Sequence, residues 1–392
     1  MKVARVETFH LGRSLWAELW EREKDLPLVT PLSGYPEYRH PYSRWYWEPA
    51  MTLVVLTADD GSTGLGWTED GVAAARAIIE RHLARFVLDR SPFEVERIWD
   101  VMYRASIPYG RAGSAMEAIS ALDIALWDLM GQAVGRPVYE LLGGPCRESV
   151  RLYASALHPV GGERVRAEAR AYVAAGYALM KGRFPCGPAD GERGMAENEA
   201  HVRTMREAAG PGIGIACDAY MGWDATYAKA MCRRLEPYDL AWIEEPVLPD
   251  DVEGYARIRR QTVIPVAGGE HEFSRWGFAR LFEAGALDIA QPDLHRCGGF
   301  TEGRKIAAMA AARGLPIINH TYSVPHLHFA LATPNCPMLE HFPQPSWAEP
   351  LPPARPLFLG EPPVDGGVAR PSGRPGLGVS LDRERLTELL AA

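Results

Sequence analysis

The sequence contains no C-x-x-C pair and has few cysteines for its length. Disulfide frameworks are typical of short secreted chains, so the scatter of these residues argues against one. The pattern indicates buried thiols in a reducing compartment. The six cysteines are Cys146, Cys186, Cys217, Cys232, Cys297 and Cys336.

Three further features are missing. No apolar run approaches the length that spans a bilayer. The first residues, MKVARVETFHLGRS, lack the apolar block and the small-residue cleavage site of a signal peptide, so we expect a cytoplasmic protein with no membrane partner. A formal net charge of -8 argues against nucleic acid as the main partner.

What is present is the composition of an ordinary globular protein, long enough for two domains. Residues 50–67, AMTLVVLTADDGSTGLGW, predict a β-hairpin with an Asp-Gly turn. Helical patterns follow at 74–88 and 113–135. The first third of the chain is therefore expected to be α+β.

From about residue 150 short predicted strands alternate with predicted helices. Strict alternation indicates parallel strands, and seven or eight such units favour a closed barrel over an open sheet. The predicted strands are VRLYASA, YALMKGRF, IGIACDAY, AWIEEP, IPVAGGE, LDIAQPD and LPIINH. The Gly- and Pro-rich residues 358–382 are expected to return to the N-terminal domain.

Acidic residues stand at the ends of three successive predicted strands. Asp218, Glu244 and Glu270 are evenly spaced, with one strand–helix unit between each and the next. The C-terminal ends of barrel strands form the rim that carries the chemistry of barrel enzymes. Three carboxylates in one mouth repel unless a cation lies among them, and an all-carboxylate set suits Mg²⁺ first and Mn²⁺ second. The alternative is three independent rim acids.

Glu244 is followed directly by Glu245, which raises the question of which one enters the mouth. Successive side chains of a strand point to opposite faces, so both cannot do so. We assign the metal to Glu244 and expect Glu245 to face outward in a salt bridge.

The next two predicted strands end in Asp293 and His320, at nearly the same interval as the three acids. An aspartate that holds the far nitrogen of a histidine fixes its tautomer and raises its basicity, as a general base requires. A structural histidine with a satisfied hydrogen bond is the alternative. Glu340 follows at a shorter interval, after another apolar patch, and is a weaker candidate.

Several motifs in this order resemble the enolase superfamily, mandelate racemase subgroup. They are SALDIALWDLMGQAVGRPVYELLGG, the three strand-end acids, GEHE, QPD and the strand of His320. Within the subgroup, the sequence is most similar to acid-sugar dehydratases of the L-rhamnonate dehydratase type. The motifs that carry this closer similarity are KGRFPCGPADGERG, PDDVEGYA, GGEHEFSRWGF, QPDLHRCGGFTE and SVPHLHF.

The resemblance implies a modified (β/α)₇β TIM-like barrel with an α+β N-terminal capping domain. The cap is expected over residues 1–130, completed by about 355–392, and the barrel over 131–354. Relatives of this kind form homo-oligomers, so we expect a homo-oligomer here as well.

The resemblance also implies roles for individual residues. Asp218, Glu244 and Glu270 hold Mg²⁺, Asp293 and His320 form the basic dyad, and Glu340 hydrogen-bonds the carboxylate of the substrate. His271, beside the third metal ligand, either contacts the substrate or supports the site. In the loop YRHPYSRWYW, the candidate substrate contacts are His40 and Arg44.

The sequence departs from the family at the second barrel strand. Many members carry Lys-x-Lys there, with the second lysine as a base, whereas this chain has Lys181 and Arg183. A guanidinium does not deprotonate in proteins, so Arg183 can bind a carboxylate or a hydroxyl but cannot act as a base. Lys181 is a candidate substrate ligand or second proton carrier, and a structural charge near the acids is the alternative.

These inferences together predict a hydro-lyase that acts on a small-molecule sugar acid, with a rhamnonate-like aldonate favoured. His320 would remove the α-proton, and loss of the β-hydroxyl would give a 2-keto-3-deoxy sugar acid. The alternatives are a racemase or epimerase of an α-substituted carboxylate on the same scaffold, and a non-catalytic metal-binding barrel.

Overall fold

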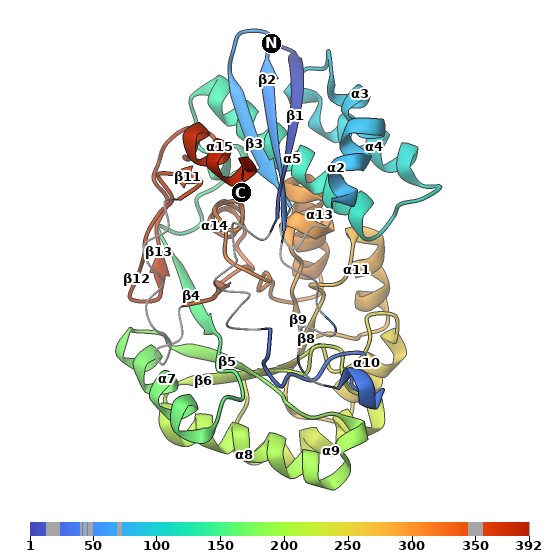
Figure 1. The fold of residues 1–392 in the computed structure, drawn as a ribbon, viewed down its shortest axis with the longest axis vertical. Coiled ribbons are helices and arrows are strands. Elements are labelled where there is room, and N and C mark those ends of the chain that lie inside the picture. Colours follow the sequence, from blue (N-terminus) through green and yellow to red (C-terminus); the bar gives the residue numbers. More distant parts are fainter. Residues whose placement is uncertain are drawn as a thin grey trace.

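The computed structural model describes residues 1–12, 24–39, 41, 45, 50–68, 73–343 and 356–391. The cap end of the molecule contains an antiparallel sheet of β1 (Val3–Leu11), β2 (Met51–Ala58) and β3 (Thr63–Trp67). The last two strands confirm the predicted hairpin. Figure 1 shows this sheet at the top of the molecule.

The long helix α5 (Ser114–Val134) packs against β3, and two glycines make the close approach possible. A Cβ atom on Gly64 would lie 2.3 Å from the carbonyl oxygen of Ala125, and one on Gly66 would lie 2.0 Å from that of Ala121. Both distances are far below van der Waals contact, so any side chain at either position would force the helix away from the sheet.

Of the other cap helices, one was predicted and shows a local difference, and α4 (Val95–Ser106) was not predicted. The predicted helix 74–88 is divided into α2 (Ala74–Ile78), a π-helical turn at Ile79–Leu83 and α3 (Ala84–Val87). Helix α4 then packs beside α5.

The barrel strands run parallel and pair in chain order. They are β4 (Val150–Ser155), β5 (Leu179–Arg183), β6 (Gly214–Asp218), β7 (Trp242–Glu244), β8 (Val266–Gly268) and β9 (Ile289–Ala290). On the other side of β4 lies β10 (Met338–His341), which is also parallel to it. Six of the seven predicted barrel strands are therefore present, and β10 is an addition.

The seventh predicted strand, 315–320, is reduced to a single parallel bridge between Ala290 and Ile317. Pro316 has no N–H to give to a ladder, and the N–H of Ile317 turns to the carbonyl of Asn335 at 2.7 Å. The N–H of Thr321 donates to Glu340 Oε2 at 3.0 Å. These contacts place the segment between β9 and β10.

Helices separate consecutive strands and lie on the outside of the sheet. Figure 1 shows α7, α8 and α9 around the lower end of the molecule. The helices are α7 (Gly162–Ala174), α8 (Gly191–Ala209), α9 (Ala225–Leu235), α10 (Val252–Arg259), α11 (Ser274–Glu283), α12 (Leu294–Cys297), α13 (Gly299–Ala311) and α14 (Val324–Ala332).

The C-terminal return contacts both parts of the molecule. Helix α15 (Arg383–Ala391) packs on β1 of the cap, as expected. The small strand β13 (Val368–Ala369), however, pairs antiparallel with β4 of the barrel. The domain boundaries near residues 130 and 355 remain predictions.

An N-terminal segment, residues 24–39, crosses the ends of β5 and β6, as the dark blue trace in Figure 1 shows. The N–H of Val29 donates to Phe184 O at 2.9 Å, and Leu26 and Leu28 pack on Tyr220. At its end Arg39 pairs with Asp190 at 3.1 Å. The segment therefore covers part of the barrel rim.

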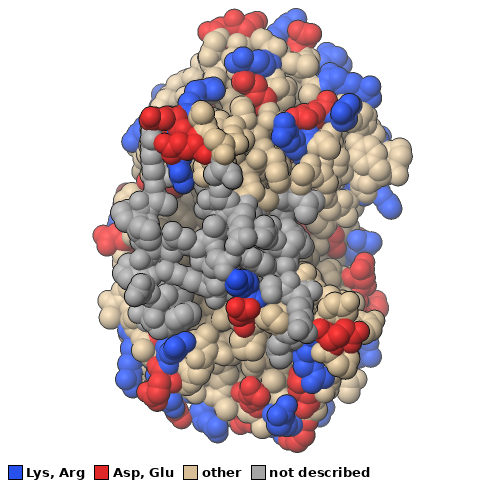
Figure 2. Space-filling model, in the orientation of Figure 1, with Lys and Arg blue, Asp and Glu red and all other residues tan. Residues whose placement is uncertain are grey.

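The surface in Figure 2 mixes Lys and Arg with Asp and Glu on the face in view. Among the described residues, none of the helices combines the length and apolarity that crossing a membrane needs.

Candidate active site

The strand ends bring the three predicted metal ligands to one side of the barrel rim. Asp218 is the last residue of β6 and is in register with Glu244, the last residue of β7. Glu270 lies two residues beyond β8. All three side chains are buried, so none of them is an ordinary surface acid.

Lys181 of β5 supplies a positive charge among these acids. Its Nζ forms an ion pair with Glu244 and another, at 2.7 Å, with Glu340, and it lies 3.9 Å from Asp218 Oδ2. Burial alone would lower the pKa of Lys181, but the negative charges of Glu244 and Glu340 outweigh it and hold that pKa well above the usual value. The side chain is therefore an ammonium in an acidic environment.

The carboxylates of this cluster differ in their hydrogen-bond partners. Glu244 Oε2 accepts hydrogen bonds from Trp242 Nε1 and Gln291 Nε2, both at 2.8 Å. Asp218 Oδ2 has no hydrogen-bond partner among the described residues, although it is buried. Burial raises the pKa of Asp218 to about 6 and that of Glu244 to about 7, despite the nearby ammonium of Lys181.

These observations fit a divalent cation. A buried carboxylate oxygen without a donor is costly, and a hard cation bound by oxygen ligands removes that cost. The donor set of Asp218, Glu244 and Glu270 consists only of carboxylates, which suits Mg²⁺ better than a soft metal.

A second arrangement lies beside these acids. In the described part of the chain, Glu245, Glu270 and His271 form one group whose possible ligand atoms lie within 4.8 Å of one another. His271 Nδ1 contacts Glu245 Oε2 at 2.8 Å and lies 3.6 Å from Glu270 Oε1. The predicted pairing of Glu245 is therefore present, but the side chain is buried beside Glu270 instead of facing outward. His271 contacts both of these acids.

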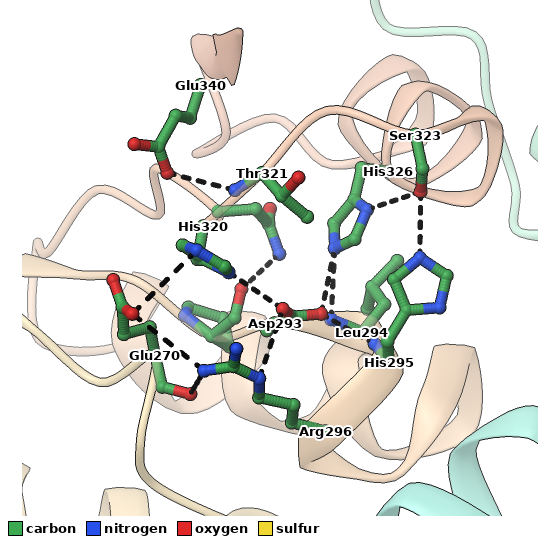
Figure 3. Close-up of polar contacts among 12 residues, drawn as sticks. Glu270, Asp293, Leu294, His295, Arg296, His320, Thr321, Ser323, His326 and Glu340 are labelled. Carbon is green, nitrogen blue, oxygen red and sulfur yellow. Dashed lines mark hydrogen bonds and ion pairs between the residues drawn. The ribbon is translucent and has the colours of Figure 1, made fainter. Parts of the chain in front are cut away.

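The predicted base dyad lies next to Glu270, as Figure 3 shows. Asp293 precedes α12, and its Oδ2 accepts a hydrogen bond from His320 Nδ1 at 2.8 Å. Its Oδ1 accepts the backbone N–H of His295 at 2.7 Å. Burial alone would raise the pKa of Asp293, but the hydrogen-bonded imidazole of His320 outweighs it, and that pKa lies well below the usual value.

The hydrogen bond to Asp293 turns the other nitrogen of His320 toward the acids. His320 Nε2 lies 3.7 Å from Glu270 Oε1. Burial lowers the pKa of His320, but the charge of Glu270 and the hydrogen bond to Asp293 outweigh it and raise that pKa to about 10. A cation bound by Glu270 would offset part of this charge, so the same imidazole would release its proton more readily.

Glu340 of β10 connects the two sides of the rim. Its Oε2 accepts the N–H of Thr321, and its Oε1 faces the Lys181 ammonium. Burial alone would raise the pKa of Glu340, but the charges of Lys181 and His320 together outweigh it and lower that pKa. Glu340 is therefore a fixed carboxylate between the lysine and the loop that follows His320.

Arg183 and His271 meet at an aromatic ring that the sequence did not single out. The guanidinium of Arg183 lies 4.8 Å from the ring centre of Tyr220, and His271 and Trp45 contact the same ring edge-on at 5.6 and 5.5 Å. Arg183 Nε is also 3.7 Å from Asp218 Oδ2. His40 and Arg44 lie outside the described residues.

Sequence reasoning also missed two polar neighbours of the site. Gln291 donates to Glu244, and Arg296 lies 3.7 Å from Asp293 Oδ2 and 3.8 Å from Glu270 Oε1. Both are close in sequence to Asp293, in the motif QPDLHRCGG. A rule that considers every polar residue within one helical turn of a predicted rim acid would have found them.

Models of known families match both parts of the chain. Residues 164–385 match the family model described as Enolase C-terminal domain-like, and residues 47–143 match the Mandelate racemase / muconate lactonizing enzyme, N-terminal domain. The chain belongs to the enolase superfamily. Both the resemblance found in the sequence and the mandelate racemase subgroup are confirmed.

Two relatives of this enolase superfamily member carry related names. L-rhamnonate dehydratase of Saccharopolyspora erythraea is 40% identical over 361 residues, which cover 91% of this chain and 90% of that protein. The crystal structure of rhamnonate dehydratase from Gibberella zeae complexed with Mg is 31% identical, with a TM-score of 0.87 over 99% of this chain and 95% of the other.

A third similar structure has a different name. The crystal structure of a racemase from Streptomyces coelicolor A3(2) with bound magnesium is 29% identical, with a TM-score of 0.82 over 99% of both chains. These structural similarities confirm the expected TIM-like barrel with an N-terminal capping domain.

Proposed function

We propose that this enzyme is a Mg²⁺-dependent acid-sugar dehydratase, a hydro-lyase that converts a sugar acid into a 2-keto-3-deoxy sugar acid. The single observation that carries the proposal is the position of His320. Its Nδ1 is held by Asp293, while its Nε2 faces the carboxylate cluster across 3.7 Å. A base is thus oriented toward the place where a metal-bound acid would lie.

The residues that would hold Mg²⁺ are Asp218, Glu244 and Glu270. Asp218 Oδ2, which accepts no hydrogen bond from the described residues, supports this assignment. When bound, the ion supplies positive charge that stabilises the negative charge developing on the substrate carboxylate. Mn²⁺ is a possible substitute because it has similar ligand preferences.

His320 has two tasks in the proposed reaction. The Asp293 carboxylate holds the Nδ1–H, so Nε2 is the nitrogen that receives the α-proton. The electron pair of the broken C–H bond forms the new double bond as the β-carbon–oxygen bond breaks. His320 returns its proton to the departing hydroxyl, water leaves, and the resulting enol becomes the keto acid.

The surroundings of Lys181 favour dehydration over racemisation. Racemisation needs a base on each face of the α-carbon, and Lys181, the candidate for the second face, is instead ion-paired with Glu244 and Glu340. Arg183 cannot deprotonate. Lys181 therefore serves as a fixed positive charge beside the metal acids, and His320 remains the base on one face.

The names of the relatives support an aldonate similar to L-rhamnonate as the substrate. Glu340 would contact the substrate carboxylate region through its fixed position beside Lys181. Arg183 and His271, which frame the ring of Tyr220, would contact substrate hydroxyls, and His40 and Arg44 are further candidates.

The test is incubation of the purified protein and Mg²⁺ with a panel of mono- and diacid sugars that includes L-rhamnonate. Semicarbazide detects the keto acid, and parallel reactions in D₂O detect a deuterated epimer. Keto acid from an aldonate supports the proposal. A deuterated epimer without keto acid would support the racemase instead, and neither product from any acid would contradict an enzymatic role of this class.

A further inference from the structure

A chain of hydrogen bonds leads away from Asp293 into the cap. His326 Nε2 accepts the backbone N–H of Leu294, the residue after Asp293, at 3.0 Å. His326 Nδ1 contacts Ser323 Oγ at 2.8 Å. Figure 3 shows these contacts on the opposite side of Asp293 from His320.

The chain continues through one more histidine. Ser323 Oγ contacts His295 Nε2 at 2.9 Å, and His295 Nδ1 contacts the backbone carbonyl of Trp67 at 2.8 Å. His295 and His326 are fully buried. Trp67 is the last residue of β3 in the cap sheet, so the chain joins the cap to the base dyad.

The two end groups of this hydrogen-bond chain determine which atom donates and which accepts at every link. Leu294 N–H can only donate, and Trp67 C=O can only accept. His295 must therefore carry its proton on Nδ1, so its Nε2 accepts from the Ser323 hydroxyl. Ser323 in turn accepts from His326 Nδ1–H, which leaves His326 Nε2 to accept from Leu294.

One contact competes with this assignment. His326 Nε2 also lies 3.4 Å from Asp293 Oδ1, where a proton on Nε2 would form an ion pair or a long hydrogen bond. The contact with Leu294 N–H is shorter, and Oδ1 already accepts the N–H of His295 at 2.7 Å. The geometry therefore favours an unprotonated Nε2 on His326.

We propose that Ser323, with His295 and His326, is a positioning group that fixes the Leu294 peptide, and with it the orientation of Asp293 and His320, relative to the cap. The proposal rests on the proposed function in one respect, namely that His320 is the base. None of the three residues touches the reacting atoms, so they act through Asp293.

Contacts within the cap hold Trp67, the residue at the cap end of these hydrogen bonds. Trp67 pairs with Leu53 in the cap sheet and stacks on Phe358 with ring centres 4.6 Å apart. The adjacent N–H of Thr68 donates to Thr52 O at 3.1 Å. A shift of β3 would therefore displace the carbonyl that ends the chain, and cap position and base orientation would change together.

The decisive variants change one hydroxyl. Ser323→Ala removes the central link, and Ser323→Thr keeps a hydroxyl at the same position. If the chain orients the base, Ser323→Ala lowers kcat about 10- to 100-fold while KM stays within about twofold, and Ser323→Thr restores most of kcat. Activity is measured as keto-acid formation from the best substrate of the sugar-acid panel.

Ser120→Ala is the matched control. Ser120 is a buried serine of α5 that also joins cap and barrel, since its Oγ accepts the N–H of Gly298 at 2.9 Å. It does not belong to the hydrogen-bond chain of His295, Ser323 and His326. Its loss is expected to lower the melting temperature and leave kcat within about twofold, because a lost buried hydrogen bond away from the dyad acts on stability. An equal loss of kcat in both alanine variants would overturn the proposal.

A second measurement does not depend on turnover. Nitrogen-15 NMR of histidine-labelled wild-type protein reports the tautomer of each imidazole, with signals assigned through His295→Gln and His326→Gln. The expected result is a neutral ring protonated on Nδ1 for both residues. A proton on Nε2 of either ring would overturn the proposal even if no variant folds.

The two measurements separate the possible failures. Absence of turnover in wild-type protein would count against the proposed function, while the tautomers would still test the direction of the chain. Normal kcat in Ser323→Ala, or no recovery in Ser323→Thr, would show that Ser323 does not position the base.

Discussion

The two sides of the barrel rim are built in opposite ways. On the side of β6 and β7, buried carboxylates share one ammonium, and Asp218 Oδ2 has no hydrogen-bond partner among the described residues. On the side of Asp293, both carboxylate oxygens are hydrogen-bonded and the neighbouring histidines continue the chain to the cap. The first side is suited to receive a cation, and the second is suited to hold an imidazole in one orientation.

This contrast explains why both sides are needed. A preorganised base without a cation has nothing to stabilise the charge that forms when the α-proton leaves, and a bound cation without an oriented base has no proton acceptor. Glu270 lies at the junction, because it belongs to the acid cluster and also faces His320 Nε2.

The largest expected effect comes from removing the base. His320→Asn should lower kcat by about 10³- to 10⁴-fold or more, because it removes the nitrogen assigned to take the α-proton. Keto-acid formation measures the loss. Mg²⁺ affinity by calorimetry should stay near the wild-type value.

A buried histidine outside the site provides the control for this variant. His328 accepts the N–H of Tyr139 and contacts the carbonyl of Leu377, and neither partner belongs to the dyad. His328→Gln should lower stability and retain kcat. Ordinary turnover in His320→Asn would remove His320 from its role.

Removing a metal ligand should weaken Mg²⁺ binding, which the His320 variant leaves unchanged. Asp218→Asn is expected to abolish Mg²⁺-dependent turnover and weaken Mg²⁺ binding about 10- to 100-fold or more, while the His320–Asp293 hydrogen bond persists. Titration calorimetry with Mg²⁺ checks the affinity. An unchanged affinity would refute the assignment of Asp218 as a ligand.

Lys181→Met tests the acid cluster through the stability of the folded protein. It leaves Glu244 and Glu340 buried without their ammonium, which is expected to cost about 3 to 5 kcal/mol of unfolding free energy. Added Mg²⁺ should raise the melting temperature of this variant more than that of the wild type, because the ion replaces part of the lost charge.

Lys305→Met is the matched lysine control, since Lys305 is partly exposed and pairs with Glu96 at the surface. It should cost less stability than Lys181→Met, because its partner Glu96 is exposed and its contact with the buried Glu302 is longer, at 3.8 Å. An equal Mg²⁺ response in the two lysine variants would contradict the role given to Lys181.

The smallest expected effect on activity concerns the junction between cap and barrel, away from both sides of the rim. Asp123 of α5 accepts the N–H of Thr301 in α13 at 3.0 Å, its other oxygen has no hydrogen-bond partner among the described residues, and burial raises its pKa to about 7. A raised pKa means that the folded state binds more protons than the unfolded state between about pH 4 and pH 7. The stabilising effect of the protonated group is therefore complete at low pH and is lost as pH rises through 7.

Asp123→Asn should remove this dependence. Relative to wild type, the variant should gain stability as pH rises from 4 to 8, by no more than about 4 kcal/mol, while kcat at a fixed pH changes little. Chemical denaturation across this range measures the difference. Parallel pH profiles of the two proteins would show that Asp123 is not the group responsible.

The fold and the central site residues were predictable because the strand–helix unit repeats at a nearly constant length. The spacing of Asp218, Glu244 and Glu270 follows from one strand–helix unit each, and parallel strands bring equivalent positions to one edge. The structure places these acids at neighbouring strand ends, as predicted. The strand predicted at 315–320 was less regular: Pro316 has no N–H and the N–H of Ile317 donates to Asn335, so the segment keeps only a single bridge, to Ala290 of β9.

What the sequence did not reveal depends on contacts between distant segments. His295 and Ser323 of the barrel meet Trp67 of the cap, although His295 and Trp67 are separated by 228 positions in the sequence. The position of Tyr220 between Arg183 and His271 arises in the same way. No local pattern encodes such pairings.

The most direct test is a crystal structure of the His320→Asn variant with Mg²⁺ and the sugar acid that the wild type dehydrates. We expect one ion bound by Asp218, Glu244 and Glu270, with the α-hydrogen of the acid directed at the position of residue 320. An ion bound instead by Glu245 and His271, or an α-hydrogen directed toward Lys181, would contradict the assignment of metal site and base.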